Sequence, residues 1–259
     1  MKLKPKKSLS QNFLKNKEIL NILANSLPDI HNEVVVEIGG GLGNLTQFLV
    51  LAKQLIVYEI DNVLSKKLKD KFKDYQNIKI INSDFLKANL KKFNHKYYLI
   101  GNIPYFITGK ILRKIFNINN YPKIAVITFQ KEYAQKILGK DGNNFLYSWI
   151  KTFSSVKKIV EIKKNNFFPA PKVDSLALKF EFYSQPLIKE LKKFENFLKT
   201  LFKFNKRTIL NNLKLKYSNK IINKLESNLL AKRPHQLTFD ETLELFNILK
   251  NNEKNNKKV

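Results

Sequence analysis

The sequence predicts an α/β fold in which helices cover an open, mostly parallel β-sheet. An apolar run at residues 34–38 is too short for a helix and leads directly into Gly39, Gly41 and Gly43. Further short apolar runs alternate with segments of helical period, which is typical of strand–helix–strand units. Polar residues follow several of these runs, and the carboxyl ends of parallel strands share one edge of a sheet.

The strands of this sheet are predicted in the first 183 residues. Parallel strands are expected at 34–38, 55–58, 78–81, 97–100 and 124–128, and antiparallel strands at 156–162 and 176–182, which brings the sheet to about seven strands. Helices are predicted at 45–52, 63–75, 107–116 and 129–138. From Ser184 the pattern turns helical and rich in lysine, so we expect one domain over 1–183 and a small α-helical domain over 184–259.

The charge of the chain predicts a polyanionic partner. The 48 Lys and Arg residues outnumber the 21 Asp and Glu residues, for a net charge of +27. Residues 1–17 contain six lysines and no acid, and residues 184–259 contain 17 basic and 7 acidic residues. Codon usage in an A/T-rich genome would also favour lysine, so the excess has a second explanation. Its clustering favours a nucleic-acid surface.

Other features of the composition indicate the cellular compartment. Cysteine is absent, which excludes disulfides and thiolate metal sites and fits a reducing compartment. No apolar run approaches the roughly 20 residues that span a bilayer, and the first residues are not an apolar leader. We therefore expect a soluble, cytoplasmic protein with no membrane partner.

The glycine loop and the ends of the next strands predict a nucleotide site. Gly39 and Gly41 permit a tight turn and a close approach of ligand to backbone, although such a loop can also be a plain strand-to-helix turn. Glu59 stands 20 residues after Gly39, where an acid can accept from ribose hydroxyls. Asp84 and Asn102 end the third and fourth strands; for Asp84 the alternative is a helix N-cap. The G-x-G-x-G spacing favours S-adenosylmethionine over a dinucleotide.

Three further motifs carry a resemblance to a known family. They are Gln-Asn-Phe-Leu at 11–14, Asn-Ile-Pro-Tyr at 102–105 and Phe-Phe-Pro-Ala-Pro-Lys-Val-Asp-Ser at 167–175. In this order, over nearly the whole chain, they resemble the ribosomal RNA adenine dimethyltransferases, particularly the small-subunit branch. The resemblance implies a class I methyltransferase sheet, S-adenosylmethionine as cofactor, and a monomer that acts on small-subunit ribosomal RNA within a pre-ribosomal particle. It implies no metal.

The resemblance also implies roles for individual residues. Asn12 and Leu14 would contact the cofactor, as would Gly39, Gly41, Asn102 and Phe85, with Glu59 on the ribose and Asp84 on the adenine amine. Asn102 and the backbone carbonyl beside Pro104 would accept from the target N6 amine and localise its lone pair. Tyr105 and Phe167 would stack on the flipped adenine, while Phe168 is expected to pack.

Two other functions remain open from the sequence. One is methylation of a large-subunit adenine, as in macrolide-resistance enzymes, and the other is a non-catalytic ribosome-assembly or transcription factor. The presence of Glu59, Asp84 and Asn102 together argues against a pure binding protein. The chain departs from the family pattern at Leu146 and within 205–213, which affects how RNA is held.

Overall fold

The structure, a computed structural model, describes residues 11–255 and divides the chain into two compact units. The first unit comprises residues 1–134 and 154–184, and the second comprises 135–153 and 185–259. The lysines expected to bind RNA at positions 2–7 lie outside the described residues. Residues 135–153 fall in the second unit, although they precede the expected boundary at Ser184.

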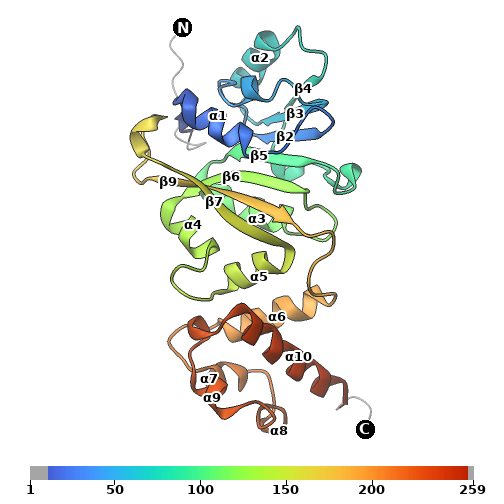
Figure 1. The fold of residues 1–259 in the computed structure, drawn as a ribbon, viewed down its shortest axis with the longest axis vertical. Helices are drawn as coiled ribbons and strands as arrows, with labels where there is room; N and C mark the ends of the chain where they lie inside the picture. The colour runs from blue at the N-terminus through green and yellow to red at the C-terminus, as the bar shows by residue number, and fades with distance from the viewer. Residues whose placement is uncertain (1–10, 256–259) are drawn as a thin grey trace. The chain divides into compact units, whose positions relative to one another are not determined.

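A seven-stranded sheet forms the centre of the first unit (Figure 1). Its strand order is β4-β3-β2-β5-β6-β9-β7. The strands are β2 (Val34–Ile38), β3 (Gln54–Glu59), β4 (Ile78–Asn82), β5 (Tyr98–Asn102), β6 (Ile124–Gln130), β7 (Ser154–Ile162) and β9 (Ser175–Phe182). Strands β2 to β6 are parallel, and β9 is antiparallel to both β6 and β7. The predicted sheet and its two antiparallel strands are thus confirmed.

The strand order reverses between β2 and β5. From β2 the chain moves outward through β3 to β4, and it then returns to the other side of β2 to form β5. The connections that leave β2 and β5 therefore diverge, and a crevice opens at the carboxyl ends of these two strands. This reversal places the glycine loop opposite Asn102, the last residue of β5.

Two of the four connections between parallel strands contain an α-helix, α2 (Asn62–Lys71) between β3 and β4 and α3 (Thr108–Ile115) between β5 and β6, and the other two contain 3-10 turns. Helix α1 (Lys17–Asn25) precedes β2, and α4 (Lys131–Ile137) follows β6. The helix predicted at 45–52 is wrong, because only a 3-10 turn forms there, η2 at Thr46–Phe48. Backbone bonds from Phe48 to Leu45 and from Ala52 to Leu49 span three residues and so tighten this segment into successive turns.

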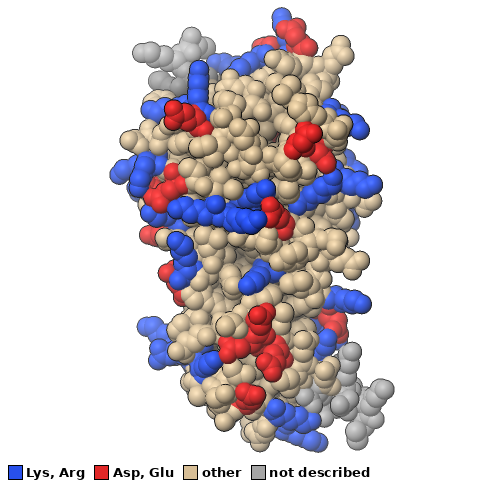
Figure 2. Space-filling view, in the orientation of Figure 1, with Lys and Arg blue, Asp and Glu red and all other residues tan. Residues whose placement is uncertain are grey.

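The central strands β2, β3, β5 and β6 are buried on both faces, which explains their continuous apolar runs. On one face Val35, Leu55 and Val126 pack in a cluster with α1 and α2. On the other face Phe116, at the end of α3, meets Phe180 of β9 edge to face with ring centroids 5.5 Å apart. The face of this unit in Figure 2 carries a band of basic side chains, interspersed with acids, where β7 and β9 contribute lysines.

The second unit is helical. Its helices are α5 (Phe145–Phe153), α6 (Leu191–Leu201), α7 (Ile209–Leu213), α8 (Asn219–Ile222), α9 (Ser227–Ala231) and α10 (Phe239–Asn255). The apolar faces predicted around Phe194 and Phe246 meet in one core, with their ring centroids 5.0 Å apart. Phe145 and Trp149 of α5 pack against the same core, which accounts for the place of 135–153 in this unit.

Candidate active site

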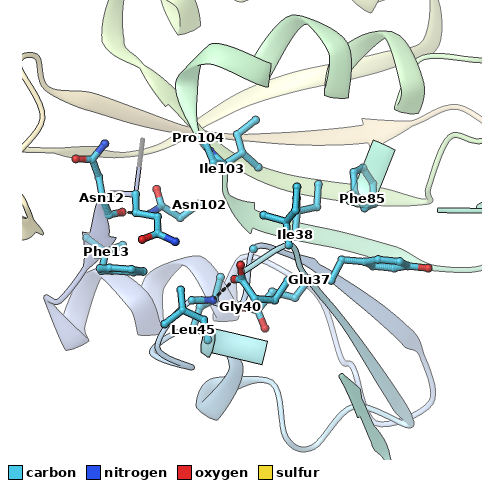
Figure 3. Close-up of a pocket in the computed structure, with 18 of the residues that line it drawn as sticks. Asn12, Phe13, Glu37, Ile38, Gly40, Leu45, Phe85, Asn102, Ile103 and Pro104 are labelled. Carbon is cyan, nitrogen blue, oxygen red and sulfur yellow. Dashed lines mark hydrogen bonds between the residues drawn. The ribbon is translucent and has the colours of Figure 1, made fainter. Parts of the chain in front are cut away.

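A cavity of about 310 Å³ lies at the carboxyl ends of β2, β3, β4 and β5. Its volume is within the range of small-molecule sites. Ten of the eleven residues singled out in the sequence line it: Asn12, Leu14, Gly39, Gly41, Glu59, Asp84, Phe85, Asn102, Pro104 and Tyr105. In Figure 3 Asn12 and Asn102 lie beside one another at one side of the cavity, and Phe85 lies at the opposite side.

Glu59 shapes the glycine loop from the end of β3. Gly39 and Gly41 have φ angles of +74° and +56°, a region that favours glycine. In this conformation the Gly41 N–H donates to Oε2 of Glu59 at 2.8 Å, and the Asp61 N–H donates to Oε1 at 2.8 Å. Burial raises the pKa of Glu59 while these two amides lower it, and the net shift is upward. Each carboxylate oxygen can still accept a further bond from a ligand hydroxyl.

Glu37 is a cavity residue that the sequence reasoning missed. It lies within β2, is 1% exposed, and its Oε2 has no hydrogen-bond partner among residues 11–255. Burial, reinforced by the charge of Glu59, raises its pKa to about 7. The available signal was a charged residue within the apolar run 34–38, since a buried strand tolerates a carboxylate only when a partner or a ligand meets it.

The opposite wall is held in place by a lysine. Oδ1 of Asp84 accepts from the Leu86 N–H at 2.8 Å, so Asp84 caps the 3-10 turn η3 (Phe85–Lys87) and its Oδ2 can face a ligand. Phe85 is 4% exposed. Lys114 of α3 donates through Nζ to the Leu86 carbonyl at 3.0 Å and to the Ala88 carbonyl at 2.6 Å. The helix that follows the Asn-Ile-Pro-Tyr motif is therefore tied to this turn.

The Gln-Asn-Phe-Leu segment covers part of the cavity. Its last two residues form β1 (Phe13–Leu14), which pairs antiparallel with β8 (Phe167–Phe168). Three side-chain bonds from separate elements hold the segment: Gln11 Nε2 to Asp61 Oδ2 at 3.3 Å, Asn102 Nδ2 to the Asn12 carbonyl at 3.0 Å, and Asn44 Nδ2 to the Leu14 carbonyl at 2.9 Å. Residues far apart in the sequence thus close one wall.

The side chain of Tyr105 is held by a hydrogen bond to the first residue of β9. Its hydroxyl lies 2.6 Å from Oγ of Ser175, the fully buried first residue of β9. Burial raises the pKa of Tyr105 and the Ser175 bond lowers it, with a net rise, so the phenol stays neutral. Ser175 ends the Phe-Phe-Pro-Ala-Pro motif, and this bond therefore joins two motifs recognised in the sequence.

Phe167 is the predicted site residue that does not line the cavity. It is 2% exposed and packs in the core of the first unit, whereas Phe168 is 57% exposed. The alternation along β8 sends neighbouring side chains to opposite faces, and pairing with Leu14 directs Phe167 inward. In this structure the burial of the two residues is the reverse of that expected, because Phe167 packs in the core and Phe168 is exposed.

The charges around the cavity favour a cationic ligand. The charged residues that line it are Glu37, Glu59 and Asp84, all acidic in a protein with a net charge of +27. A diphosphate would meet like charge here, so the site disfavours a dinucleotide. Apolar walls at Leu45, Phe85 and Ile103 suit a flat ring system between these acids. Along 11–255, no helix has the length and apolar character needed to cross a membrane.

Comparison with known protein families bears on this site. A sequence model of the family "Ribosomal RNA adenine dimethylase" matches residues 2–251. A relative from Mycoplasma mobile, named ribosomal RNA small subunit methyltransferase A, is 40% identical over 217 residues, which cover 82% of this chain and 84% of the relative. A relative of the same name from Metamycoplasma arthritidis is 36% identical over 263 residues, covering 98% of this chain and 100% of the relative.

Two solved structures share the fold over most of the chain. The 23S rRNA methyltransferase ErmE superposes with a TM-score of 0.78 at 25% identity, covering 92% of this chain and 100% of its own. A dimethyladenosine transferase from Plasmodium falciparum superposes with a TM-score of 0.77 at 27% identity, covering 92% of this chain and 98% of its own. The sheet is therefore that of the class I methyltransferases, as the sequence predicted.

Proposed function

Because the chain belongs to the ribosomal RNA adenine dimethylase family, we propose that it dimethylates N6 of adenosines in small-subunit ribosomal RNA, with S-adenosylmethionine as methyl donor. The small subunit is favoured over the large one by the names of the relatives at 36% and 40% identity, since the 23S enzyme is only 25% identical. The shared fold does not separate these two substrates.

The orientation of Asn102 is the observation that carries this proposal. Its Nδ2 is committed to the Asn12 carbonyl, so Oδ1 is the atom that can accept from an incoming amine. The Pro104 carbonyl already accepts from the Ile107 N–H at 3.3 Å, and we therefore assign the second acceptor to the carbonyl of Ile103. The proline ring fixes this turn, with φ at −61°.

Two hydrogen-bond acceptors at these positions would make the target amine a better nucleophile. The lone pair of an adenine N6 amine is delocalised into the ring, which makes it a poor nucleophile. Acceptors on both N–H bonds draw the nitrogen toward tetrahedral geometry and aim its lone pair at the donor. This is catalysis by orientation and electrostatic stabilisation, in which no strong base takes part. Tyr105, pinned by Ser175, offers a ring face to the flipped adenine.

The cavity fits S-adenosylmethionine, which supplies a methyl group already activated by its sulfonium charge. Glu59 would accept from the ribose hydroxyls and Asp84 from the adenine amine, while Phe85 would contact the adenine ring. Asn12 and Leu14 would close the cofactor beneath the N-terminal segment, and Gly39 and Gly41 would let it approach the loop. The orphaned Oε2 of Glu37 matches a cationic group of such a ligand.

The basic C-terminal region, residues 184–259, would hold the RNA. Residues 184–259 contain 17 basic and 7 acidic residues and none of the motifs assigned to methyl transfer. We assign them to ribosomal RNA binding, and the methyltransferase domain to residues 1–183. The protein would act in the cytoplasm as a monomer on a pre-ribosomal particle.

The test is methylation of separated ribosomal subunits. The protein is incubated with radiolabelled S-adenosylmethionine and either small or large subunits that lack the modification, and labelled adenosines are mapped by mass spectrometry. Label as N6,N6-dimethyladenosine in the small subunit alone is the expected result. Label in the large subunit would favour the macrolide-resistance activity, and cofactor or RNA binding without transfer would favour a non-catalytic assembly factor.

A further inference from the structure

The aromatic ring of Phe106 is exposed to solvent at the cavity. Phe106 follows Tyr105 in the 3-10 turn η5 (Tyr105–Ile107), lines the cavity, and is 60% exposed. The residues on either side of it, Tyr105 and Ile107, are partly buried, and Ile103 at the start of the same loop is only 2% exposed. Phe106 is therefore the exposed residue of this turn, and its side chain does not gain the hydrophobic stabilisation that burial would give.

The backbone that carries Phe106 is held on both sides. Before it, the Tyr105 hydroxyl is bonded to Ser175 at 2.6 Å, and after it the Ile107 N–H donates to the Pro104 carbonyl at 3.3 Å. The helix α3 follows directly, and Lys114 anchors that helix to the turn after Asp84. The exposed ring thus projects from a fixed support, which is the arrangement that a preorganised binding contact requires.

The position of the ring within the cavity indicates its ligand. Glu37 lies within β2, Glu59 ends β3 and Asp84 follows β4, whereas Phe106 follows β5 in the loop of Tyr105, where the target adenine enters on the proposed function. When an adenine leaves its stack to enter such a cavity, the neighbouring base loses a stacking partner. An exposed aromatic ring beside the entrance can take that place, because every base has a π face.

We propose that Phe106 stacks on the nucleobase adjacent to the target adenosine. The inference rests on the proposed function and adds a second RNA contact, distinct from the ring of Tyr105 assigned to the target base. Phe106 would stabilise the extruded state of the RNA from outside the reacting centre. Its loss should weaken productive RNA binding and leave both the methyl transfer step and the cofactor site intact.

The variants Phe106→Ala and Phe106→Trp separate stacking from structure. With the RNA mapped above as substrate, Phe106→Ala should raise the KM for RNA roughly 5- to 150-fold, the range measured for one stacked base, with kcat and the KM for S-adenosylmethionine within about twofold of wild type. Phe106→Trp should restore the KM for RNA. Leu51→Ala is the matched control, because Leu51 is 62% exposed in the same unit and does not line the cavity; it should stay within about twofold.

A fluorescent base tests the contact directly. RNAs carrying 2-aminopurine on the 5′ or the 3′ side of the target adenosine should show stacking-dependent quenching on one side with wild type and Phe106→Trp, and lose it with Phe106→Ala. An unchanged KM and unchanged quenching in Phe106→Ala would overturn the proposal. So would a selective fall in kcat, which would place the ring on the target base, or a selective rise in the cofactor KM. If wild type methylates no RNA, the proposed function itself fails.

Discussion

The side-chain Nδ2 of Asn102 donates to the main-chain carbonyl oxygen of Asn12 at 3.0 Å, across 90 residues of sequence. The bond fixes which end of the Asn102 amide faces the cavity, because the nitrogen is committed to the N-terminal segment. An amide whose orientation is set in advance needs no reorganisation when the target amine arrives.

Replacement of Asn102 should therefore affect turnover far more than binding. Asn102→Ala should lower the single-turnover rate of methyl transfer by about two to four orders of magnitude, with RNA affinity nearly intact. Asn44→Ala is the matched control, since Asn44 also lines the cavity and also donates to the N-terminal segment, at the Leu14 carbonyl. A rate for Asn102→Ala within about threefold of wild type, or equal losses in both variants, would remove Asn102 from the mechanism.

Glu59 should be a determinant of cofactor affinity. Glu59→Ala removes a carboxylate and also frees the Gly41 N–H that it holds, so binding of S-adenosylmethionine should weaken by about 1.5 to 3 kcal/mol. Calorimetric titration measures this change. Glu33→Ala provides a control, because Glu33 pairs with Lys123 and does not line the cavity. Equal affinity in wild type and Glu59→Ala would exclude a ribose contact.

Glu37 should make stability depend on pH. Its pKa is raised from 4.5 to about 7, so between these values the folded chain keeps a proton that the unfolded chain releases. The free energy of unfolding should consequently fall as pH rises through this window, by about 3 kcal/mol in total from this group. Glu37→Gln is neutral throughout and should gain stability relative to wild type as pH rises from 5 to 8, measured by urea unfolding. Parallel pH profiles would show that Glu37 titrates normally.

Substitutions of Phe167 and Phe168 should affect different properties of the protein, stability in the first case and RNA binding in the second. Phe167→Ala removes a buried ring and should destabilise the fold by about 3 to 5 kcal/mol. Phe168→Ala should leave the Tm nearly unchanged and raise the KM for RNA if the exposed ring is the one that meets a base. A stable Phe167→Ala protein with impaired methyl transfer would instead support the role implied by the family motif, in which Phe167 leaves the core to stack.

The second unit should contribute phosphate contacts. Lys203, Lys206 and Arg207 are exposed on one loop, and neutralising each should reduce the slope of log affinity against log salt by about 1 if it contacts a phosphate. Lys199→Ala is the control, because Lys199 is already paired with Glu195 at 2.6 Å. Point variants are preferable to deletion of 184–259, which would expose the apolar residues of α5. Equal slopes in all variants would give this loop another role.

Much of the fold could be predicted because its elements are local in the sequence. Apolar runs such as 34–38 and 124–128 are too short for helices, and they became strands. The helix predicted at 45–52 failed because the loop before it contains Gly43 at a φ of +75°, and its bonds span three residues. The apolar pattern of a segment indicates which of its residues are buried, but it does not predict the hydrogen-bonding pattern of the backbone between them.

The site could be predicted less completely, since some of its properties are tertiary. The polar residues at strand ends came together because parallel strands share an edge. The burial of Phe167 depends on the pairing of β8 with β1, which no local pattern encodes. Glu37 could be recognised in the sequence as a charge in an apolar strand. That its Oε2 is buried without a hydrogen-bond partner in the described part of the chain depends on the residues packed around it, which the sequence does not give. Residues 135–153 belong to the second unit because Phe145 and Trp149 pack in one core with residues after 185, and this contact joins stretches that are distant in the sequence.

The acidic lining of the cavity bears on product release. The carboxylates of Glu59 and Asp84 would attract a ligand in proportion to its positive charge, and methyl transfer converts the sulfonium of the donor into a neutral thioether. The same carboxylates would therefore hold the spent cofactor less tightly than the fresh one. A dimethyltransferase must exchange its cofactor between two transfers to one nitrogen. Electrostatic discrimination against the product would speed that exchange in each cycle without any conformational switch.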